Sequence, residues 1–317
     1  MDIFIQLILL IIGFVFLMKG ADIFVDGASK IATRLGIPQL VIGLTIVAMG
    51  TSLPEAAVSI SAALKGSAEI AVGNVVGSNI LNVLLILGLS AVIMPLSVQK
   101  STFRYEIPFV FVITIIFSVL GLKDNVISFF EGILLWIFFL AYLGYLFYMT
   151  KKGEIESEES EEDEKSERVV KMIFFIIFGI VFIVFGSNVT VDAAKKIALS
   201  FGMSERLIGL TIVALGTSLP ELVTSVIAAI KGKADIAIGN IVGSNIFNIL
   251  FVIGTSALIT PVVYQSNFLF DSTVCALTIL LLWVLLINKQ RKLARFGGAV
   301  MLIAFLAYEL NLILTTI

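Results

Sequence analysis

The sequence predicts an all-α membrane protein with ten transmembrane helices, arranged as two inverted five-helix repeats. Two observations lead to this fold class. Hydrophobic residues make up 59% of the 317 residues and charged residues only 14%, whereas soluble proteins are about 45–50% apolar. A fourteen-residue stretch also occurs twice, at a separation of 166 residues. The long apolar runs do not alternate with polar residues, which argues against a transmembrane β-barrel.

The apolar residues fall into ten segments along the chain. Lengths near 20 residues suit a hydrocarbon core of roughly 30 Å. The first segment has no basic start of the kind found in signal peptides, so we interpret it as a membrane helix. Pro54 is expected to break the second. The segments cover about residues 3–18 (with a tilted continuation toward 31), 38–64, 70–93, 107–122, 127–148, 170–199, 207–230, 236–259, 268–287 and 296–317.

The repeat divides the chain into two halves. Residues 42–55 and 208–221 are identical at thirteen of fourteen positions, and residues 77–80 recur as 243–246 at the same separation. Each half contains five predicted spans, and an odd number places the second half upside down relative to the first. Inverted repeats are typical of secondary transporters, whose site lies near the membrane midplane between the repeats. The predicted division is a first repeat at 1–150, a linker at 151–168 and a second repeat at 169–317.

The basic residues predict the orientation in the membrane. Fifteen lysines and arginines fall on the side of the linker and five on the other side. Cytoplasmic loops carry the excess of basic residues, so the linker is expected to be cytoplasmic and both termini outside a plasma membrane. The linker holds nine acids between Glu154 and Glu167, a composition that predicts disorder.

Each copy of the repeated stretch combines a proline, a Thr-Ser pair and one carboxylate within an apolar run. Pro54 and Pro220 each free the carbonyl four residues earlier, and carbonyls at helix breaks attract cations. Carboxylates at membrane depth are costly and mark function. Oxygen ligands without histidine or thiolate suit Ca²⁺, Na⁺, Mg²⁺ or Mn²⁺ better than Zn²⁺ or Cu²⁺. The candidate ligands here are Glu55, Glu221, Ser52, Ser218 and the carbonyls near Ala48, Thr51, Ala214 and Thr217.

The next helix of each half offers more oxygen ligands. Ser78 and Asn82 are four residues apart and share one helical face, as do Ser244 and Asn248. If Glu55 faces Glu221 at about 6 Å, the two charges repel by roughly 3 kcal/mol at an effective dielectric near 20. One divalent ion or several Na⁺ would neutralise them.

Other polar and small residues receive structural interpretations. The patterns Gly73-x-x-x-Gly77 and Gly239-x-x-x-Gly243 are typical of close helix packing. The neighbouring asparagines at 74, 79, 240 and 245 suit hydrogen bonds between helices. Glu106 is interpreted as an acid near a helix start or loop.

The two Gly-Thr-Ser-Leu-Pro-Glu copies, each followed by Gly-Asn-x-x-Gly-Ser-Asn, resemble the α-repeats of sodium/calcium exchangers in the calcium/cation antiporter superfamily. The likeness covers nearly the whole chain, and the short linker fits a prokaryotic type without regulatory domains. It implies electrogenic antiport of Ca²⁺ against Na⁺ through common sites. The roles that it implies are Ca²⁺ binding by the carboxylates of Glu55 and Glu221 and the carbonyls of Thr51 and Thr217, Na⁺ binding by the carbonyls of Ala48 and Ala214 and the hydroxyls of Ser52, Ser218, Ser78 and Ser244, and central polar contacts by Asn82 and Asn248.

One position departs from some relatives. The potassium-dependent branch carries Asp where this chain has Asn248, which argues against potassium co-transport. The leading hypothesis is therefore a Na⁺/Ca²⁺ antiporter, and the alternative is a proton-coupled, Mn²⁺ or Mg²⁺ antiporter of the same fold. An enzyme is not expected, because the sequence lacks histidine and a core lysine base. A channel would pass Ca²⁺ without a counter-ion gradient. No cofactor and no nucleic-acid partner are expected beside the lipid bilayer, and the expected state is a monomer.

Acidic pH is expected to inhibit transport. An empty site should take up a proton, because burial and the neighbouring like charge both disfavour an ionised carboxylate. Protons would then compete with the transported cations. The check is initial Ca²⁺ flux into proteoliposomes at neutral and acidic pH, and equal rates at both would contradict this prediction.

Overall fold

The computed structural model describes residues 3–65, 69–152, 169–201, 214–265 and 268–316. Most of the predicted linker (153–168) and the start of the seventh predicted segment (207–213) lie outside these residues. So do residues 208–213, the first part of the second copy of the repeated stretch. The structural statements below concern the described ranges.

Helices dominate both halves. The first half contains α1 (Ile3–Leu35), α2 (Gln39–Ile42), the π-helical η1 (Gly43–Val47), α3 (Ala48–Thr51), α4 (Leu53–Leu64), α5 (Glu69–Leu81), π-helical η2 (Asn82–Leu87), α6 (Gly88–Ile93), π-helical η3 (Thr102–Glu106), α7 (Ile107–Asp124) and α8 (Phe129–Lys152). The second half contains α9 (Val169–Ser200), α11 (Ala214–Thr217), α12 (Leu219–Ile230), α13 (Ala234–Phe247), π-helical η6 (Asn248–Ile253), α14 (Gly254–Ile259), α15 (Phe268–Leu285) and α16 (Arg295–Thr316).

The helices are long and apolar enough for a multi-pass membrane protein. Within the described residues, eight helices meet the length and composition of a membrane span, and nine do if the bent pair 39–51 and 53–64 counts as one. Nine of the ten predicted segments correspond to these helices, and the predicted continuation of the first segment is confirmed, since α1 runs unbroken to Leu35. The count of ten stays a prediction, because the seventh segment is only partly described.

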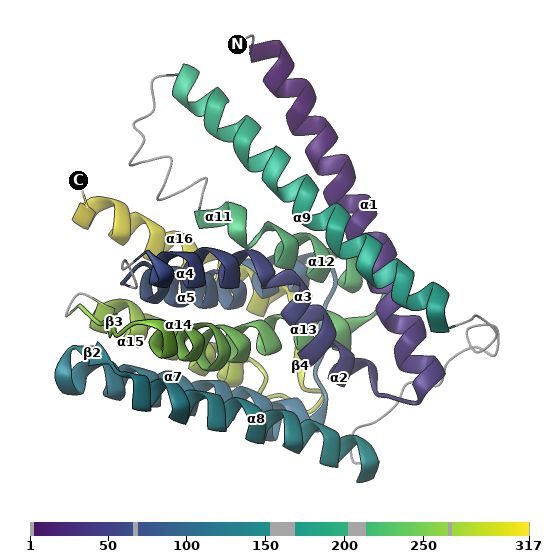
Figure 1. The fold of residues 1–317 in the computed structure, drawn as a ribbon. Coiled ribbons are helices and arrows are strands. Elements are labelled where there is room, and N and C mark those ends of the chain that lie inside the picture. Colours follow the sequence, from purple (N-terminus) through teal and green to yellow (C-terminus); the bar gives the residue numbers. More distant parts are fainter. Residues whose placement is uncertain (1–2, 66–68, 153–168, 202–213, 266–267, 317) are drawn as a thin grey trace.

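Two spans form the interior of the bundle. Residues 234–259 are 94% buried and residues 70–93 are 72% buried over their most apolar window, against 22–39% for the other six spans. Helices α1 and α9 lie side by side as a long tilted pair across the remaining helices, as Figure 1 shows in purple and teal. The two inner spans can therefore carry polar residues, because the outer spans shield them from lipid.

Each repeated stretch contains a helix break at its serine. The helix over residues 39–51 bends by 51° into α4, and Ser52 adopts φ −80° and ψ 9°. Ser218 has nearly the same conformation, φ −93° and ψ 6°, between α11 and α12. Both lie in the sparsely populated bridge region. The predicted break near Pro54 is confirmed, and it falls two residues before the proline because proline is well tolerated in the first turn of the next helix.

Two very short strand pairs join the halves at their loops. Strand β1 (Leu96–Ser97) pairs antiparallel with β4 (Lys292–Leu293), and β2 (Val126–Ile127) pairs antiparallel with β3 (Val262–Val263). Positions 96 and 262, like 126 and 292, are 166 residues apart, so interchange of the halves turns one pair into the other. These strands are too short to be predicted from the sequence pattern.

Glycines bring α13 against the first broken helix. A Cβ atom on Gly243 would lie 2.6 Å from the carbonyl oxygen of Leu44 and 2.7 Å from the Cβ of Ala48, and Gly239 is similarly close to residues 40–44. The predicted close packing is thus confirmed for Gly239 and Gly243. The counterpart of residue 44 in the second half, residue 210, lies outside the described residues, so the same test does not extend to the glycines at 73 and 77.

Replacement of Gly243 by alanine is expected to lower thermal stability. The added methyl group meets a backbone carbonyl, and overpacking of this kind costs about 1–3 kcal/mol. The measurement is the thermal midpoint of the purified protein in detergent. Gly144→Ala on α8 is the matched control, because a Cβ atom built there meets no described residue beyond its own helix within 4 Å. An equal midpoint for the two variants would contradict the close contact.

Candidate cation site

The centre of the site is a crosswise pair of hydrogen bonds between the halves. Glu55 and Glu221 stand in the first turns of α4 and α12, and each is only 1% exposed. The hydroxyl of Ser218 donates to Oε1 of Glu55 at 3.0 Å, and the hydroxyl of Ser52 donates to Oε1 of Glu221 at 2.8 Å. The serine at each helix break therefore holds the carboxylate of the opposite half, and the two predicted glutamates do come together.

Two further serines extend these contacts. Ser52 Oγ lies 2.9 Å from Ser244 Oγ, and Ser218 Oγ lies 3.4 Å from Ser78 Oγ. All four hydroxyls are buried. The predicted set of serines therefore forms two chains, each running from one inner helix through a helix break to a carboxylate.

Asparagine side chains join the two inner spans by hydrogen bonds near the point where each span becomes π-helical. Asn82 Nδ2 donates to Oδ1 of Asn245 at 3.0 Å, and Asn248 Nδ2 donates to Oδ1 of Asn79 at 3.1 Å. Asn79 and Asn245 also donate to each other's backbone carbonyl, at 3.2 and 3.3 Å. The predicted interhelical role of residues 79 and 245 is confirmed, and these bonds set the positions of Asn82 and Asn248.

A second asparagine in each half supports the helix that carries the glutamate. Asn240 Nδ2 donates to Ser225 Oγ at 2.9 Å and to the Glu221 carbonyl at 3.4 Å, while its Oδ1 accepts from Thr51 Oγ1 at 3.0 Å. In the first half, Asn74 Nδ2 donates to Ser59 Oγ at 2.9 Å and to the Glu55 carbonyl at 3.2 Å, which matches the bonds of Asn240 to Ser225 and Glu221.

The two supporting serines were missed by the sequence analysis. Ser59 and Ser225 are both fully buried and accept the asparagine hydrogen bonds described above. Their identity at the separation of 166 residues was the available signal. Sequence alone gave no reason to distinguish them from serines that pack without a polar partner.

Four buried side-chain oxygens at this centre have no hydrogen-bond partner in the described residues: Glu55 Oε2, Glu221 Oε2, Asn82 Oδ1 and Asn248 Oδ1. They come as two pairs related by the repeat. Buried polar atoms are nearly always satisfied in native structures, so exceptions call for an explanation such as a bound ion. Two carboxylate and two amide oxygens match the preference of hard cations.

The local charge is negative and unbalanced by side chains. In the described part of the chain, no lysine or arginine forms an ion pair with either glutamate. Each carboxylate instead benefits from the positive end of its own helix, because Glu55 and Glu221 lie in first turns. Among the described residues, no three His, Cys, Asp or Glu side chains lie close enough together to hold a metal ion. A bound cation would therefore complete its shell with hydroxyl, amide and carbonyl oxygens.

The backbone carbonyls that the sequence suggests as cation ligands lie in different environments. The Ala48 carbonyl accepts from the Ser52 backbone N–H at 3.0 Å and from Ser244 Oγ at 3.4 Å. In the second half, the carbonyl of Gly216 accepts from Ser187 Oγ at 2.9 Å. The side chain of Thr51 is buried and that of Thr217 is half-buried. Ala214 is the first described residue of α11.

Buried carboxylates next to helix breaks, inside an apolar helix bundle, are typical of membrane cation transporters. The family model described as sodium/calcium exchanger protein matches residues 5–148 and 171–314. This chain therefore belongs to the sodium/calcium exchanger family, which is a family of transporters and not of enzymes.

Individual relatives agree with this assignment. The chain is 40% identical over 309 residues to the putative antiporter CaxA of Alkalimonas amylolytica, covering 95% of this chain and 97% of that protein. It is 35% identical over 340 residues to the sodium/calcium exchanger MaX1 of Methanosarcina acetivorans, covering 96% and 97%. A solved structure of the sodium-calcium exchanger NCX_Mj matches with a TM-score of 0.83 at 33% identity, covering 96% of this chain and 98% of that one.

The substitutions Glu55→Gln and Glu221→Gln are each expected to weaken Ca²⁺ binding by more than about tenfold. A contact to a charged oxygen contributes roughly 1.5–3 kcal/mol, and about 1.4 kcal/mol is a factor of ten. Calorimetric titration of the detergent-solubilised protein would measure the affinity. Glu131→Gln serves as the control, because its oxygen accepts from the Ser128 N–H at the start of α8 and takes no part in the site. Unchanged affinity in both site variants would exclude the carboxylates as ligands.

Proposed function

We propose that this protein exchanges Na⁺ for Ca²⁺ across the membrane by alternating access, with both ions bound at one site formed by the two halves. The observation that supports it best is the group of four buried oxygens without hydrogen-bond partners, two of them carboxylate oxygens. The two formal negative charges equal the charge of one Ca²⁺. Several Na⁺ ions would balance the same charge, which gives a physical basis for exchange at shared ligands.

The proposed Ca²⁺ site uses oxygens from both halves. Ca²⁺ takes 6–8 oxygen ligands at about 2.3–2.6 Å. The carboxylates of Glu55 and Glu221 are the central ligands in this proposal. The family resemblance adds the backbone carbonyls of Thr51 and Thr217. Asn82 and Asn248 supply the central polar contacts.

The proposed Na⁺ ligands lie around the same centre. The resemblance assigns them to the carbonyls of Ala48 and Ala214 and to the hydroxyls of Ser52, Ser218, Ser78 and Ser244. The serine hydroxyls of each half already contact a carboxylate or a second serine. Rotation of a hydroxyl proton would turn each of these oxygens from a donor toward a carboxylate into an acceptor for a cation.

The proposed architecture is ten spans in two inverted five-helix halves, 1–150 and 169–317, joined by a cytoplasmic linker at 151–168. Both termini would lie outside the plasma membrane. The hydrogen bonds at the centre support the symmetry, because the serine–glutamate bonds and the asparagine–asparagine bonds between the halves each have a counterpart shifted by 166 residues. Interchange of the two conformations would then expose the site to the other side of the membrane.

A coupled flux experiment tests this function. Proteoliposomes loaded with Na⁺ are diluted into Na⁺-free medium containing Ca²⁺, and Ca²⁺ uptake is recorded. We expect uptake that depends on the outward Na⁺ gradient, moves net charge and is lost in Glu55→Gln and Glu221→Gln. Uptake that follows a proton gradient and ignores Na⁺ would favour the proton-coupled alternative, and Mn²⁺ or Mg²⁺ in place of Ca²⁺ tests the other cargoes.

Potassium provides an internal comparison in the same vesicles. The chain carries Asn248 at the position where potassium-dependent relatives carry Asp, so we expect equal Ca²⁺ uptake with and without K⁺. A requirement for K⁺ would show that the charge at this position does not decide potassium coupling.

A further inference from the structure

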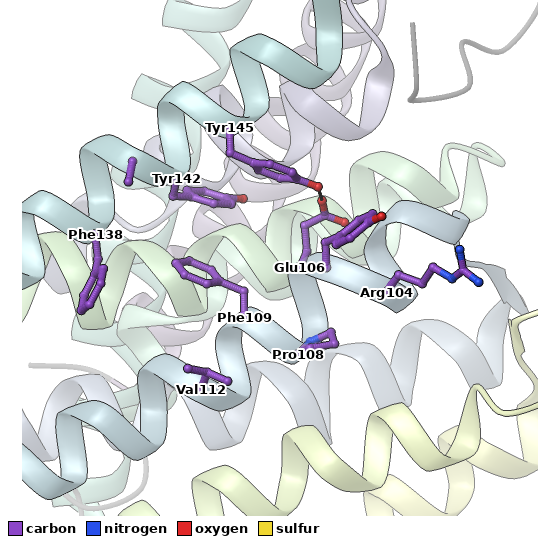
Figure 2. Close-up of a pocket in the computed structure, with 10 residues that line it drawn as sticks. Arg104, Glu106, Pro108, Phe109, Val112, Phe138, Tyr142 and Tyr145 are labelled. Carbon is purple, nitrogen blue, oxygen red and sulfur yellow. Dashed lines mark hydrogen bonds between the residues drawn. The ribbon is translucent and has the colours of Figure 1, made fainter. Parts of the chain in front are cut away.

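A cavity outside the glutamate site differs from that site in its lining residues and in its chemistry. It has a volume of about 420 Å³ and lies between the η3–α7 helix and α8. Its lining is mainly apolar and aromatic, including Pro108, Phe109, Val112 and Phe138. Figure 2 shows Phe109, Val112 and Phe138 to the left, and Glu106, Tyr145 and Arg104 to the right with Pro108 beside them. Neither Glu55 nor Glu221 lines it.

The polar end of this pocket contains two buried oxygens that lack a partner. Glu106 is 1% exposed, and its Oε1 accepts a hydrogen bond from the Tyr145 hydroxyl at 2.6 Å. Its Oε2 and the hydroxyl of Tyr142, a residue only 5% exposed, have no hydrogen-bond partner in the described residues. In Figure 2 the Tyr142 hydroxyl points toward the side where Tyr145 meets Glu106. An unpartnered carboxylate oxygen beside an aromatic hydroxyl can accept from a donor with positive charge, which forms the strongest hydrogen bonds of this kind.

A cationic side chain stands at the rim. Arg104 lines the pocket and is exposed. In the described part of the chain its guanidinium forms no ion pair or hydrogen bond. The pocket thus presents a negative group in its interior and a positive group at its mouth, so each charge of a zwitterionic ligand would have a partner of opposite sign.

The pocket opens toward lipid near one edge of the membrane. It is formed at the start of the span 102–124 and toward the end of the span 129–151. Tyr105 and Val112 on its wall are about half exposed, at 51% and 49%. Arginine and tyrosine at such a level are typical of the interface between headgroups and hydrocarbon. A ligand with an apolar tail can enter from the bilayer without crossing water.

We propose that this pocket binds a phospholipid whose headgroup ends in a primary ammonium, as in phosphatidylethanolamine. The ammonium donates to Glu106 Oε2 and Tyr142 Oη, the phosphate meets Arg104, and an acyl chain covers Phe109, Val112 and Phe138. A choline headgroup has no N–H to donate to the two free oxygens. A phosphatidylglycerol headgroup lacks the positive charge that the buried carboxylate requires.

Native mass spectrometry of the full-length protein in detergent tests the proposal. The protein is titrated with equal concentrations of phosphatidylethanolamine, phosphatidylcholine and phosphatidylglycerol of the same acyl chains. We expect one phosphatidylethanolamine to be retained at least fivefold more than either competitor. Glu106→Gln should remove this preference, and Tyr142→Phe should reduce it. Glu309→Gln on α16 is the matched control, because it removes a partly buried carboxylate that lies outside the pocket.

The rim is tested with a variant that does not disturb the buried carboxylate. Arg104→Gln is expected to weaken retention of phosphatidylethanolamine at least threefold, whereas Lys123→Gln, an exposed cation at the other end of the same helix, should leave it unchanged. Equal retention of the three lipids by the unaltered protein would overturn the proposal, and so would a preference for either competitor. Arg104→Gln also decides the matter if Glu106→Gln does not fold, since unchanged retention in that variant excludes this binding mode.

Discussion

The structure depends on how two carboxylates are kept inside an apolar bundle. A buried charge is costly unless hydrogen bonds or an opposite charge satisfy it. Each half of this protein donates a hydrogen bond to one oxygen of the other half's glutamate, through Ser52 to Glu221 and Ser218 to Glu55. Neither half contains the complete arrangement, so the polar centre exists only when the two halves are packed together. The same contacts bring both carboxylates into one polar centre.

The departures from regular helix are concentrated around this centre. The breaks at Ser52 and Ser218 turn helix ends toward the glutamates, and the π-helical segments begin at Asn82 and Asn248. Such irregular backbone at membrane depth is tolerated where it is buried in protein, and π-helical turns are frequent at functional sites. The inner spans, which contain the two π-helical segments, are 72% and 94% buried, and Ser52 and Ser218 are themselves buried, which meets this condition.

Glu106 shows a second solution to the same physical problem. Its carboxylate is as buried as the two central glutamates, yet its hydrogen bond comes from Tyr145 on the neighbouring helix of the same half. This part of the chain has no counterpart of the crosswise serines and opens toward lipid. The protein therefore separates a symmetric polar centre, which suits transported ions, from an asymmetric pocket at the membrane edge, which suits an amphiphile.

The sequence by itself determined the membrane class, the helix break near Pro54, the pairing of Glu55 with Glu221 and the four serines around them. These follow from composition, from proline chemistry and from a repeat whose positions recur at a fixed separation. All three can be read along the chain without knowing how the helices pack. Only the tertiary structure decided which serine meets which carboxylate, that Asn79 and Asn245 hold the inner spans together, and that short strands join the loops. It also showed that Glu106, which does lie near a helix start, is a buried residue that lines a pocket. These features depend on contacts between residues that are distant in sequence, and helix packing, which no local pattern encodes, sets those contacts.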